Sequence, residues 1–222
     1  MSDAQIIGGI HQFFAIIFGN NWTHFQSGSM IPEFKQGNEM AFTNRVKIRD
    51  TELRDIPIFM DYWYRSPESF IRSMGVDPTK MKPEIEQAAY LRESILSNLK
   101  IPNSKLPFLT IELDGRAVGS HSLGDVVEGE SGVFHAHLWF KEVRGIGLCT
   151  YTYPLASKVF MDRFGLKEIY FKTPSLNVGA NKIKQGLGLQ SCGEEPITYF
   201  FMLPGLTAKI YRLSRMQLDK LL

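Results

Sequence analysis

The sequence has few cysteines, almost no excess of charge and no long apolar run. Its two cysteines, Cys149 and Cys192, are not at the spacing of metal ligands. So low a count favours a reducing compartment over a disulfide framework. The formal net charge of +2 gives no reason to expect bulk binding to nucleic acid or to acidic membranes. We therefore expect a cytoplasmic protein that has no nucleic-acid partner.

The apolar run near the start spans Ile6 to Phe18 and is interrupted by glycines, His11 and Gln12. It is too short for a membrane span and has no basic leader, so we expect no stable membrane insertion. Its apolar residues recur at helical spacing, which predicts a short amphipathic helix within an N-terminal extension of residues 1–44. The helix could pack on the domain or on a second subunit, which would make the protein a homodimer. It could also cap an acceptor pocket or touch a membrane.

Residues 45–222 read as one domain of the mixed α+β class. Alternating and periodic apolar patterns predict strands at 45–49, 106–113, 116–123, 133–140, 167–172, 196–203 and 207–214, and helices at 57–65, 82–99, 147–164 and 177–185. A polar, acidic loop is expected at 124–132. The strand-helix-strand unit of residues 133–172 predicts one parallel pair. The fold expected is a mostly antiparallel sheet of six to seven strands flanked by helices.

A glycine-bearing turn joins the strand at 133–140 to the helix at 147–164. It reads Arg144-Gly145-Ile146-Gly147 and opens directly onto the helix. The free backbone N–H groups of a first helical turn and the positive end of the helix dipole together favour an anion such as phosphate. Glycines allow a phosphate to approach the main chain closely. The turn therefore predicts a phosphate-binding site.

Three segments resemble motifs of the GNAT acetyltransferase superfamily. Residues 144–149 resemble its Gln/Arg-x-x-Gly-x-Gly/Ala motif in the first and fourth positions, with Cys149 in the sixth. Asn177-Val178-Gly179-Ala180 and the later Gly188-Leu189 are similar to its Asn-x-x-Ala…Gly-Phe segment, and residues 208–213 to its closing strand. A lone glycine motif is weak evidence, whereas three matches in register favour the GNAT fold over residues 45–214. The entry to the domain is most similar to the branch that acetylates ribosomal proteins and protein N-termini.

The resemblance implies an acyl-CoA donor, usually acetyl-CoA. Its pyrophosphate would bind the backbone amides of Arg144, Gly145, Ile146, Gly147, Leu148, Cys149 and Thr150, and its pantetheine arm would add like a strand along Leu138, Trp139 and Phe140. Arg144 could pair with a phosphate or be a solvated surface residue. Asn177 would hydrogen-bond the arm or a nearby water, cap the helix that follows it, or do both.

Two histidines, His135 and His137, lie on the strand that precedes the turn. Residues two apart on a strand share one face, and the resemblance places the general base of the family on this strand. Imidazole titrates near pH 6.5, so it can accept a proton at neutral pH. The alternative is a pair of half-buried histidines satisfied by neighbours. We reject zinc, because no third ligand accompanies the two, and we expect no metal.

The sequence departs from the family at the position of its general acid. In the resemblance, many members have a tyrosine seven residues after the Asn, whereas this chain has Lys184, which we expect to be a surface charge in preference to a replacement acid. Tyr199 or Tyr151 could protonate the departing thiolate instead, and nothing in the sequence selects one. The oxyanion is expected to bind a backbone N–H near Leu138 or Trp139.

The function predicted is that of an acetyl-CoA-dependent N-acetyltransferase, which moves the acetyl group to a primary amine by direct attack in a ternary complex. The acceptor is a small-molecule amine or the amine of a peptide or protein. Two alternatives stay open: a non-catalytic acyl-CoA-binding or interaction module on the same fold, and an acyltransferase that uses a longer acyl-CoA.

Overall fold

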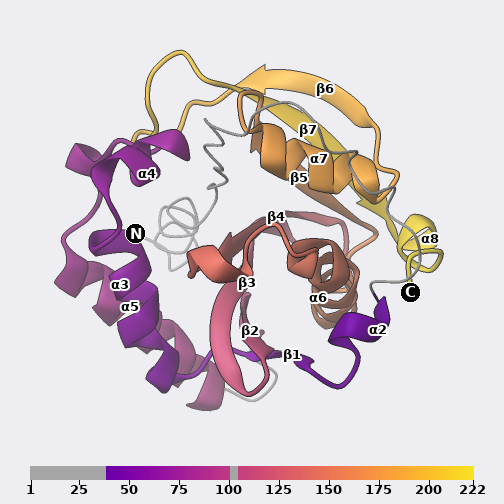
Figure 1. Cartoon of the computed structure of the whole chain (residues 1–222), viewed down its shortest axis with the longest axis horizontal. Helices are drawn as coiled ribbons and strands as arrows, with labels where there is room; N and C mark the ends of the chain where they lie inside the picture. The colour runs from indigo at the N-terminus through magenta and orange to yellow at the C-terminus, as the bar shows by residue number, and fades with distance from the viewer. Residues whose placement is uncertain (1–38, 101–104) are drawn as a thin grey trace.

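The computed structural model describes residues 39–100 and 105–222 (Figure 1). The helix expected within residues 6–18 and the rest of the extension up to residue 38 lie outside the described residues. The described chain opens with the short helix α2 (Glu39–Phe42). Phe42 is buried and its ring lies 5.4 Å from that of Tyr151. The last residues assigned to the extension therefore pack on the domain.

The described residues form a seven-stranded sheet in the order β1-β2-β3-β4-β5-β7-β6. β4 and β5 run parallel, and the other neighbours are antiparallel. This confirms the predicted class, strand number and single parallel pair. The strands are β1 (Val46–Asp50), β2 (Phe108–Leu113), β3 (Arg116–Val127), β4 (Ser131–Leu138), β5 (Glu168–Pro174), β6 (Ser191–Pro196) and β7 (Thr207–Ser214).

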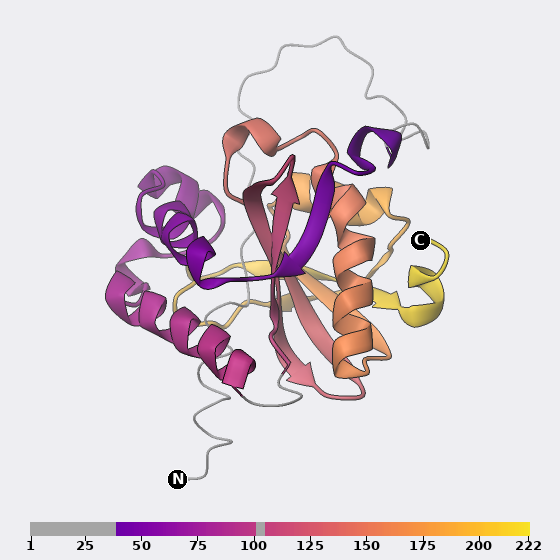
Figure 2. The same cartoon turned by 90° about the horizontal axis from the view of Figure 1, so that it is seen from below.

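Helices cover both faces of the sheet, as Figure 2 shows. The long α6 lies on one face, and α3 and α5 lie on the other. The helices after α2 are α3 (Ile56–Tyr64), α4 (Glu68–Ser73), α5 (Glu84–Lys100), α6 (Leu148–Phe164), α7 (Val178–Gly186) and α8 (Arg215–Leu218), with 3-10 turns η3 (Leu53–Asp55), η4 (Pro78–Lys80) and η5 (Lys141–Val143). The sequence did not predict α4 or α8, which have six and four residues.

The described residues form three hydrophobic clusters, and the two larger ones divide the core between these faces. Phe134 and Ala136 of β4 pack with Tyr153 and Phe160 of α6 in one cluster. The other lies under α3 and α5 and contains Trp139 from the segment that follows β4. Because side chains alternate along a strand, the even-numbered residues of β4 face α6 and the odd-numbered ones face α3 and α5.

Glycines in the left-handed region mark both ends of α6. Gly147 before the helix has φ 88°, and Gly165 after it has φ 67°. Both ends fall where the sequence predicted them. The helix continues through Pro154, which is buried within it; the proline removes one internal N–H donor without ending the helix.

Two strand predictions are corrected by the structure. β3 was expected to end at Leu123, but it continues to Val127 through a register shift after Gly124, where Asp125 has φ 46°. The expected loop at 124–132 shrinks accordingly. The strand expected at 196–203 is also wrong, because β6 ends at Pro196.

The apolar segment after β6 covers the α4 region instead of extending the sheet. Phe201 and Met202 are buried, the Asp77 amide donates to the Phe201 carbonyl at 2.8 Å, and the Leu203 amide donates to the Gly75 carbonyl at 2.8 Å. The backbone groups of Phe201 and Leu203 therefore find partners near α4, so they do not need a neighbouring strand of the sheet.

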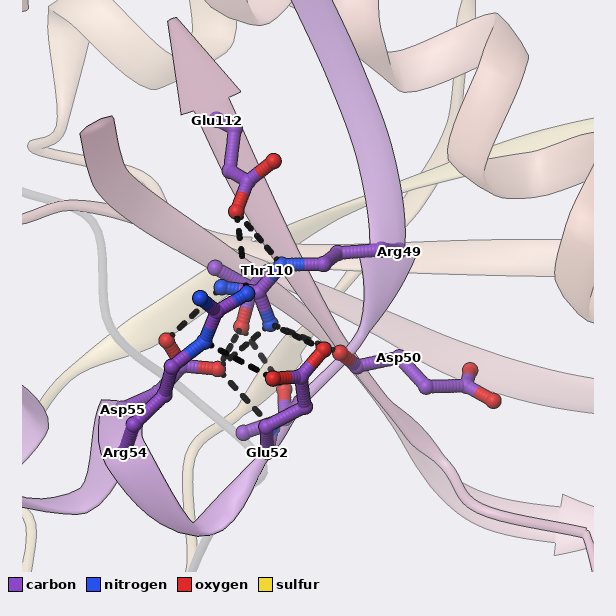
Figure 3. A network of polar contacts seen from close by, with 8 residues as sticks. Arg49, Asp50, Glu52, Arg54, Asp55, Thr110 and Glu112 are labelled. Carbon is purple, nitrogen blue, oxygen red and sulfur yellow. Dashed lines mark hydrogen bonds and ion pairs between the residues drawn. The ribbon is translucent and has the colours of Figure 1, made fainter. Parts of the chain in front are cut away.

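A buried ion-pair network fixes the start of α3 (Figure 3). Arg49 of β1 donates to both carboxylate oxygens of Asp55, at 2.7 and 2.9 Å, and to Glu112 of β2 at 2.6 Å. Asp55 also accepts from the Glu52 amide and the Thr110 hydroxyl. Although burial opposes it, the Arg49 guanidinium and these hydrogen bonds hold the pKa of Asp55 below its usual value. The network ties the α3 entry to the sheet edge.

Candidate active site between β4 and β5

The parallel pair β4 and β5 separates partway along its length. Pairing runs from Ser131 opposite Glu168 to Val133 opposite Tyr170, although β4 continues to Leu138 and β5 to Pro174. Beyond Val133 the two strands no longer pair, and we call the region between them the notch. Among the residues that the structure describes, no strand pairs with this edge of β4 from residue 134 onward.

The backbone of Leu138 faces this notch. The Trp139 amide donates to Val118 of β3 at 2.9 Å. Successive residues of a strand direct their amide groups to opposite sides, so those of Leu138 are directed away from β3. Of the two expected oxyanion donors, Trp139 is engaged within the sheet, and Leu138 is the one at the free edge.

The α6 N-terminus lies at the end of the turn that follows β4. Gly145 has φ 76° and Gly147 has φ 88°, and no side chain in the described part of the chain caps the first turn of the helix. Leu148 is buried and anchors the turn, while Ile146 is exposed. The first-turn amides and the helix dipole present an uncapped, positively polarised helix end beside β4.

Arg144 connects the turn to the strand. Its Nε and Nη2 atoms donate to the Leu138 carbonyl at 3.2 and 3.0 Å, and its guanidinium lies 4.4 Å from the ring centroid of Phe70 on α4. The side chain is half-buried, so it differs from a fully solvated arginine. The nearby Phe140 stacks under the guanidinium of Arg116 at 3.9 Å.

His135 is fully buried on the face of β4 that is directed toward α3. Within the described part of the chain, neither of its ring nitrogens has a hydrogen-bond partner. Burial holds the pKa of His135 well below its usual range, and the proximity of His137, Lys184 and Lys172 acts in the same direction. The imidazole is therefore neutral at physiological pH and has free hydrogen-bonding capacity.

His137 lies on the same face, as the alternation predicted, but it has close neighbours. Its Nδ1 lies 3.4 Å from the Tyr62 hydroxyl, and its ring centroid is 5.7 Å from Tyr62 and 5.2 Å from Trp63. Burial lowers its pKa to about 3, and the positive charge of Arg144 adds to the effect. His137 thus packs as a neutral ring under α3.

A third buried histidine, His121, was not singled out from the sequence. It lies opposite Ala136 on the α6 face of the sheet, where its Nε2 is 2.9 Å from the Thr152 hydroxyl. Burial lowers its pKa to about 3. Strand alternation would have placed it on the opposite face from the other two, and it belongs to the core under α6.

Lys184 is not the surface charge that the sequence suggested. It is fully buried on α7, with Nζ 5.2 Å from the ring centroid of Tyr153 and 5.8 Å from that of Phe171. Burial lowers the pKa of Lys184 to about 7, opposed by the neighbouring Cys149. The prediction failed because the pattern of this short helix does not show that its 184 position faces the core.

Asn177 caps α7, which is one of the two roles that the sequence predicted for it. Its Oδ1 accepts from the Ala180 amide at 3.1 Å. Its Nδ2 is buried and has no hydrogen-bond partner among the residues that the structure describes. The cap therefore uses the acceptor of the amide and leaves its donor available.

The other candidate acids have separate contacts. The Tyr199 hydroxyl donates to Asp125 at 2.9 Å, and burial with this carboxylate raises the pKa of Tyr199. Tyr151 packs on Phe42. Cys149 is half-buried, and burial raises its pKa to about 12, so it is a neutral thiol.

Within residues 39–100 and 105–222, no group of three or more His, Cys, Asp and Glu side chains is arranged to hold a metal ion. No helix in the same ranges is long and apolar enough to cross a membrane.

Comparison with known proteins finds similarity in structure alone. No family model and no curated protein sequence matches the chain. Similar solved structures include a spermidine N-acetyltransferase from Vibrio cholerae in complex with CoA and spermine, with 13% identity, TM-score 0.64, and coverage of 79% of this chain and 99% of that one. Another is RimL, a ribosomal-protein alpha-N-acetyltransferase in complex with coenzyme A, with 10% identity, TM-score 0.62, and coverage of 78% and 96%.

A third is MccE, a microcin C7 self-immunity acetyltransferase in complex with acetyl-CoA and AMP, with 15% identity, TM-score 0.61, and coverage of 77% and 93%. The chain therefore has the fold of an acyl-CoA N-acyltransferase. More specifically, it has the fold of the GNAT acetyltransferases, which confirms the resemblance at the level of the fold.

Proposed function

We propose that this protein is an acetyl-CoA-dependent N-acetyltransferase that acts on a primary amine by direct attack in a ternary complex. The observation that carries the proposal is the notch between β4 and β5, where no described strand pairs with the edge of β4 at Leu138 and the N-terminus of α6 lies beside it. A strand edge suits the amides of a pantetheine arm, and a helix N-terminus suits a pyrophosphate. Acetyl-CoA contains both groups in one molecule.

The donor would be held by the residues of the turn and the strand edge. The amides of residues 145–150 would bind the pyrophosphate, Leu138 would pair with the arm, and the Nδ2 of Asn177 would donate to the arm or to a water beside it. Phosphate binding would draw Arg144 from the Leu138 carbonyl, which frees that carbonyl for the arm. Trp139 and Phe140 would support this edge by packing.

His135 is the general base in this proposal. In the described structure neither ring nitrogen is engaged, so one of them is available to accept the proton that the acceptor ammonium must lose. Burial lowers the pKa of His135 and so makes the ring a weaker base than a free imidazole, which the bound acceptor must offset. His137, whose ring lies against the Tyr62 hydroxyl, would assist His135 in removing this proton. The amide of Leu138 would stabilise the oxyanion that forms on the carbonyl oxygen.

The acceptor side is less constrained. The similar structures act on a polyamine and on a ribosomal protein, so their names do not narrow the acceptor of this chain. We propose a small-molecule amine or a peptide amine. Half-buried Cys149 and exposed Cys192, both free, support a reducing cytoplasmic location.

Two measurements test this proposal. Acetyl-CoA at a hundred times its Kd should raise the free energy of unfolding by about 2.7 kcal/mol, and CoA thioesters of increasing chain length would show which acyl group is accepted. Release of free thiol should then require an amine from a panel of polyamines, aminoglycosides and peptides. Stabilisation by acyl-CoA without thiol release for any acceptor would favour the non-catalytic binding module.

A further inference from the structure

Lys184 is one of two lysines on α7, and the two have opposite environments. Lys182 is exposed, whereas Lys184 is fully buried. A lysine that serves only packing normally extends its ammonium group to water along its flexible chain. The Lys184 side chain instead ends between the aromatic rings of Tyr153 and Phe171.

The two rings beside Lys184 Nζ come from β5 and α6, the elements next to the notch. Phe171 is the first residue of β5 beyond its last pairing with β4, which joins Val133 to Tyr170. Tyr153 lies in the second turn of α6. The titratable groups that interact with Lys184 are Cys149 and Tyr153 on α6 and His135 on β4. The ammonium group therefore lies among the elements that form the proposed donor site.

We propose that Lys184 is the proton donor to the thiol that leaves when the thioester is cleaved. The proposal rests on the acetyltransferase function argued above. It assigns the acid that the sequence left open between Tyr151 and Tyr199. The Tyr199 hydroxyl already donates to Asp125, and no described contact brings Tyr151 to the notch.

The reaction balances with groups of this chain and the two substrates. His135 takes a proton from the acceptor ammonium and passes it to solvent. The neutral amine attacks the carbonyl carbon, so that a C–N bond forms and the C–S bond breaks with its electron pair on sulfur. Lys184 as ammonium gives its proton to that sulfur and becomes a neutral amine. The surplus proton of the new amide nitrogen leaves through His135, and a proton from solvent restores Lys184.

The environment of Lys184 suits a reversible donor. Burial lowers its pKa to about 7, so it can give up a proton and regain it at neutral pH, which is the condition for efficient general acid catalysis. A surface lysine would hold its proton too firmly for this task.

Three variants separate this role from packing: Lys184→Met, which keeps volume without a proton; Lys184→Arg, whose guanidinium stays charged; and Lys182→Met on the exposed side of the same helix as a control. We expect the two Lys184 variants to lower kcat about 10²-fold to 10⁴-fold while acetyl-CoA affinity is kept. Lys182→Met should match the wild type.

The leaving group provides the sharper readout. An aryl thioacetate, whose thiol is far more acidic than that of CoA, needs little protonation as it departs. The ratio of wild-type to Lys184→Met turnover should therefore fall toward one with this donor. The same defect with both donors, or a loss of kcat that follows a loss of acetyl-CoA affinity, would overturn the proposal in favour of a structural role.

Two further results act independently of turnover. In an NMR titration of protein with carbon-13-labelled lysines, one side-chain signal that is absent from Lys184→Met should titrate near neutral pH. If that signal titrates in the same range as the surface lysines, the assignment of Lys184 as the acid is wrong. Intact-mass spectra after incubation with acetyl-CoA should show no acetylated form that Lys184→Met lacks. An acetyl group on Lys184 would mean that this lysine attacks the thioester as a nucleophile and does not act as a proton donor. If wild type turns over and Lys184→Met turns over equally, this proposal alone fails; if wild type binds no acyl-CoA, the proposed function fails as well.

Discussion

Lys184 carries its charge into an apolar environment, and this has a consequence for stability. Its pKa is about 7 in the folded protein and near 10.5 for an exposed lysine. Between these values the unfolded chain binds more protons than the folded one, so the wild type gains stability as pH rises through this window. Below pH 7 Lys184 is charged in both the folded and the unfolded protein, so burial of this charge lowers the free energy of unfolding by its full amount.

The prediction concerns Lys184→Met, which removes this penalty. The variant should have a higher free energy of unfolding than the wild type at pH 6, by several kcal/mol. The difference should shrink as pH rises toward 10. Urea unfolding at pH 6, 8 and 10 measures it, with Lys182→Met as the control that stays parallel to the wild type. A difference that stays constant from pH 6 to pH 10 would contradict the burial of the charge.

The two histidines of β4 differ in the partners they have, and this predicts different roles. His135→Gln should lower kcat about 10²-fold or more, because it removes the proposed base. His137→Gln should have a smaller effect on kcat and should also lower stability, because His137 packs on Tyr62 and Trp63. Steady-state kinetics at saturating donor and unfolding curves for both variants would compare them. Unchanged turnover in the double variant would remove both from the mechanism.

At the scale of elements, α6 has left-handed glycines at both ends, and only one end is proposed to bind ligand. Gly147→Ala and Gly165→Ala should each cost about 1–2 kcal/mol of stability, because an L-residue is strained in the left-handed region. Around Gly165 an added Cβ would have ordinary contacts alone, so the cost of that variant reports backbone strain without a clash.

The matched pair tests the donor site directly. Acetyl-CoA affinity, measured by calorimetric titration, should fall for Gly147→Ala and stay at the wild-type value for Gly165→Ala. Equal affinities in the two variants would show that the α6 N-terminus does not bind the donor.

The entry to α3 depends on the buried pair of Arg49 and Asp55, whose side chains are 9% and 3% exposed. Removing one member leaves the other charge buried, which costs about 3–5 kcal/mol. Asp55→Ala should therefore destabilise the protein by that amount in urea unfolding. Lys158→Ala, which breaks an exposed ion pair with Asp162 on α6, should cost less than about 0.5 kcal/mol. Comparable losses in the two variants would mean that the network of Figure 3 does not hold α3.

At the scale of the whole molecule, the elements that local signals define were predictable. The glycines around α6 and the alternating pattern of β7 predicted nearly the observed bounds of these two elements. The shared face of His135 and His137 followed from strand periodicity alone. These features depend on neighbours in sequence.

The features that the sequence did not predict depend on contacts between residues far apart in the chain. The segment after β6 has an aromatic, strand-like pattern, yet its backbone pairs with Gly75 and Asp77. The burial of Lys184 follows from the divergence of β4 and β5 and from the position of α6, which no local pattern reports. The continuation of β3 required Asp125 in the left-handed region, a conformation that its sequence neighbours do not demand.

The most direct test of the account is product analysis with acetyl-CoA and a panel of amines. The purified protein should transfer one acetyl group to at least one amine, detected as a mass increase of the acceptor, with one free thiol released for each amide formed. The reaction should be lost in the variant that combines His135→Gln with His137→Gln. Binding of acetyl-CoA without any acetylated product across polyamines, aminoglycosides and peptides would contradict the assignment of this protein as an N-acetyltransferase.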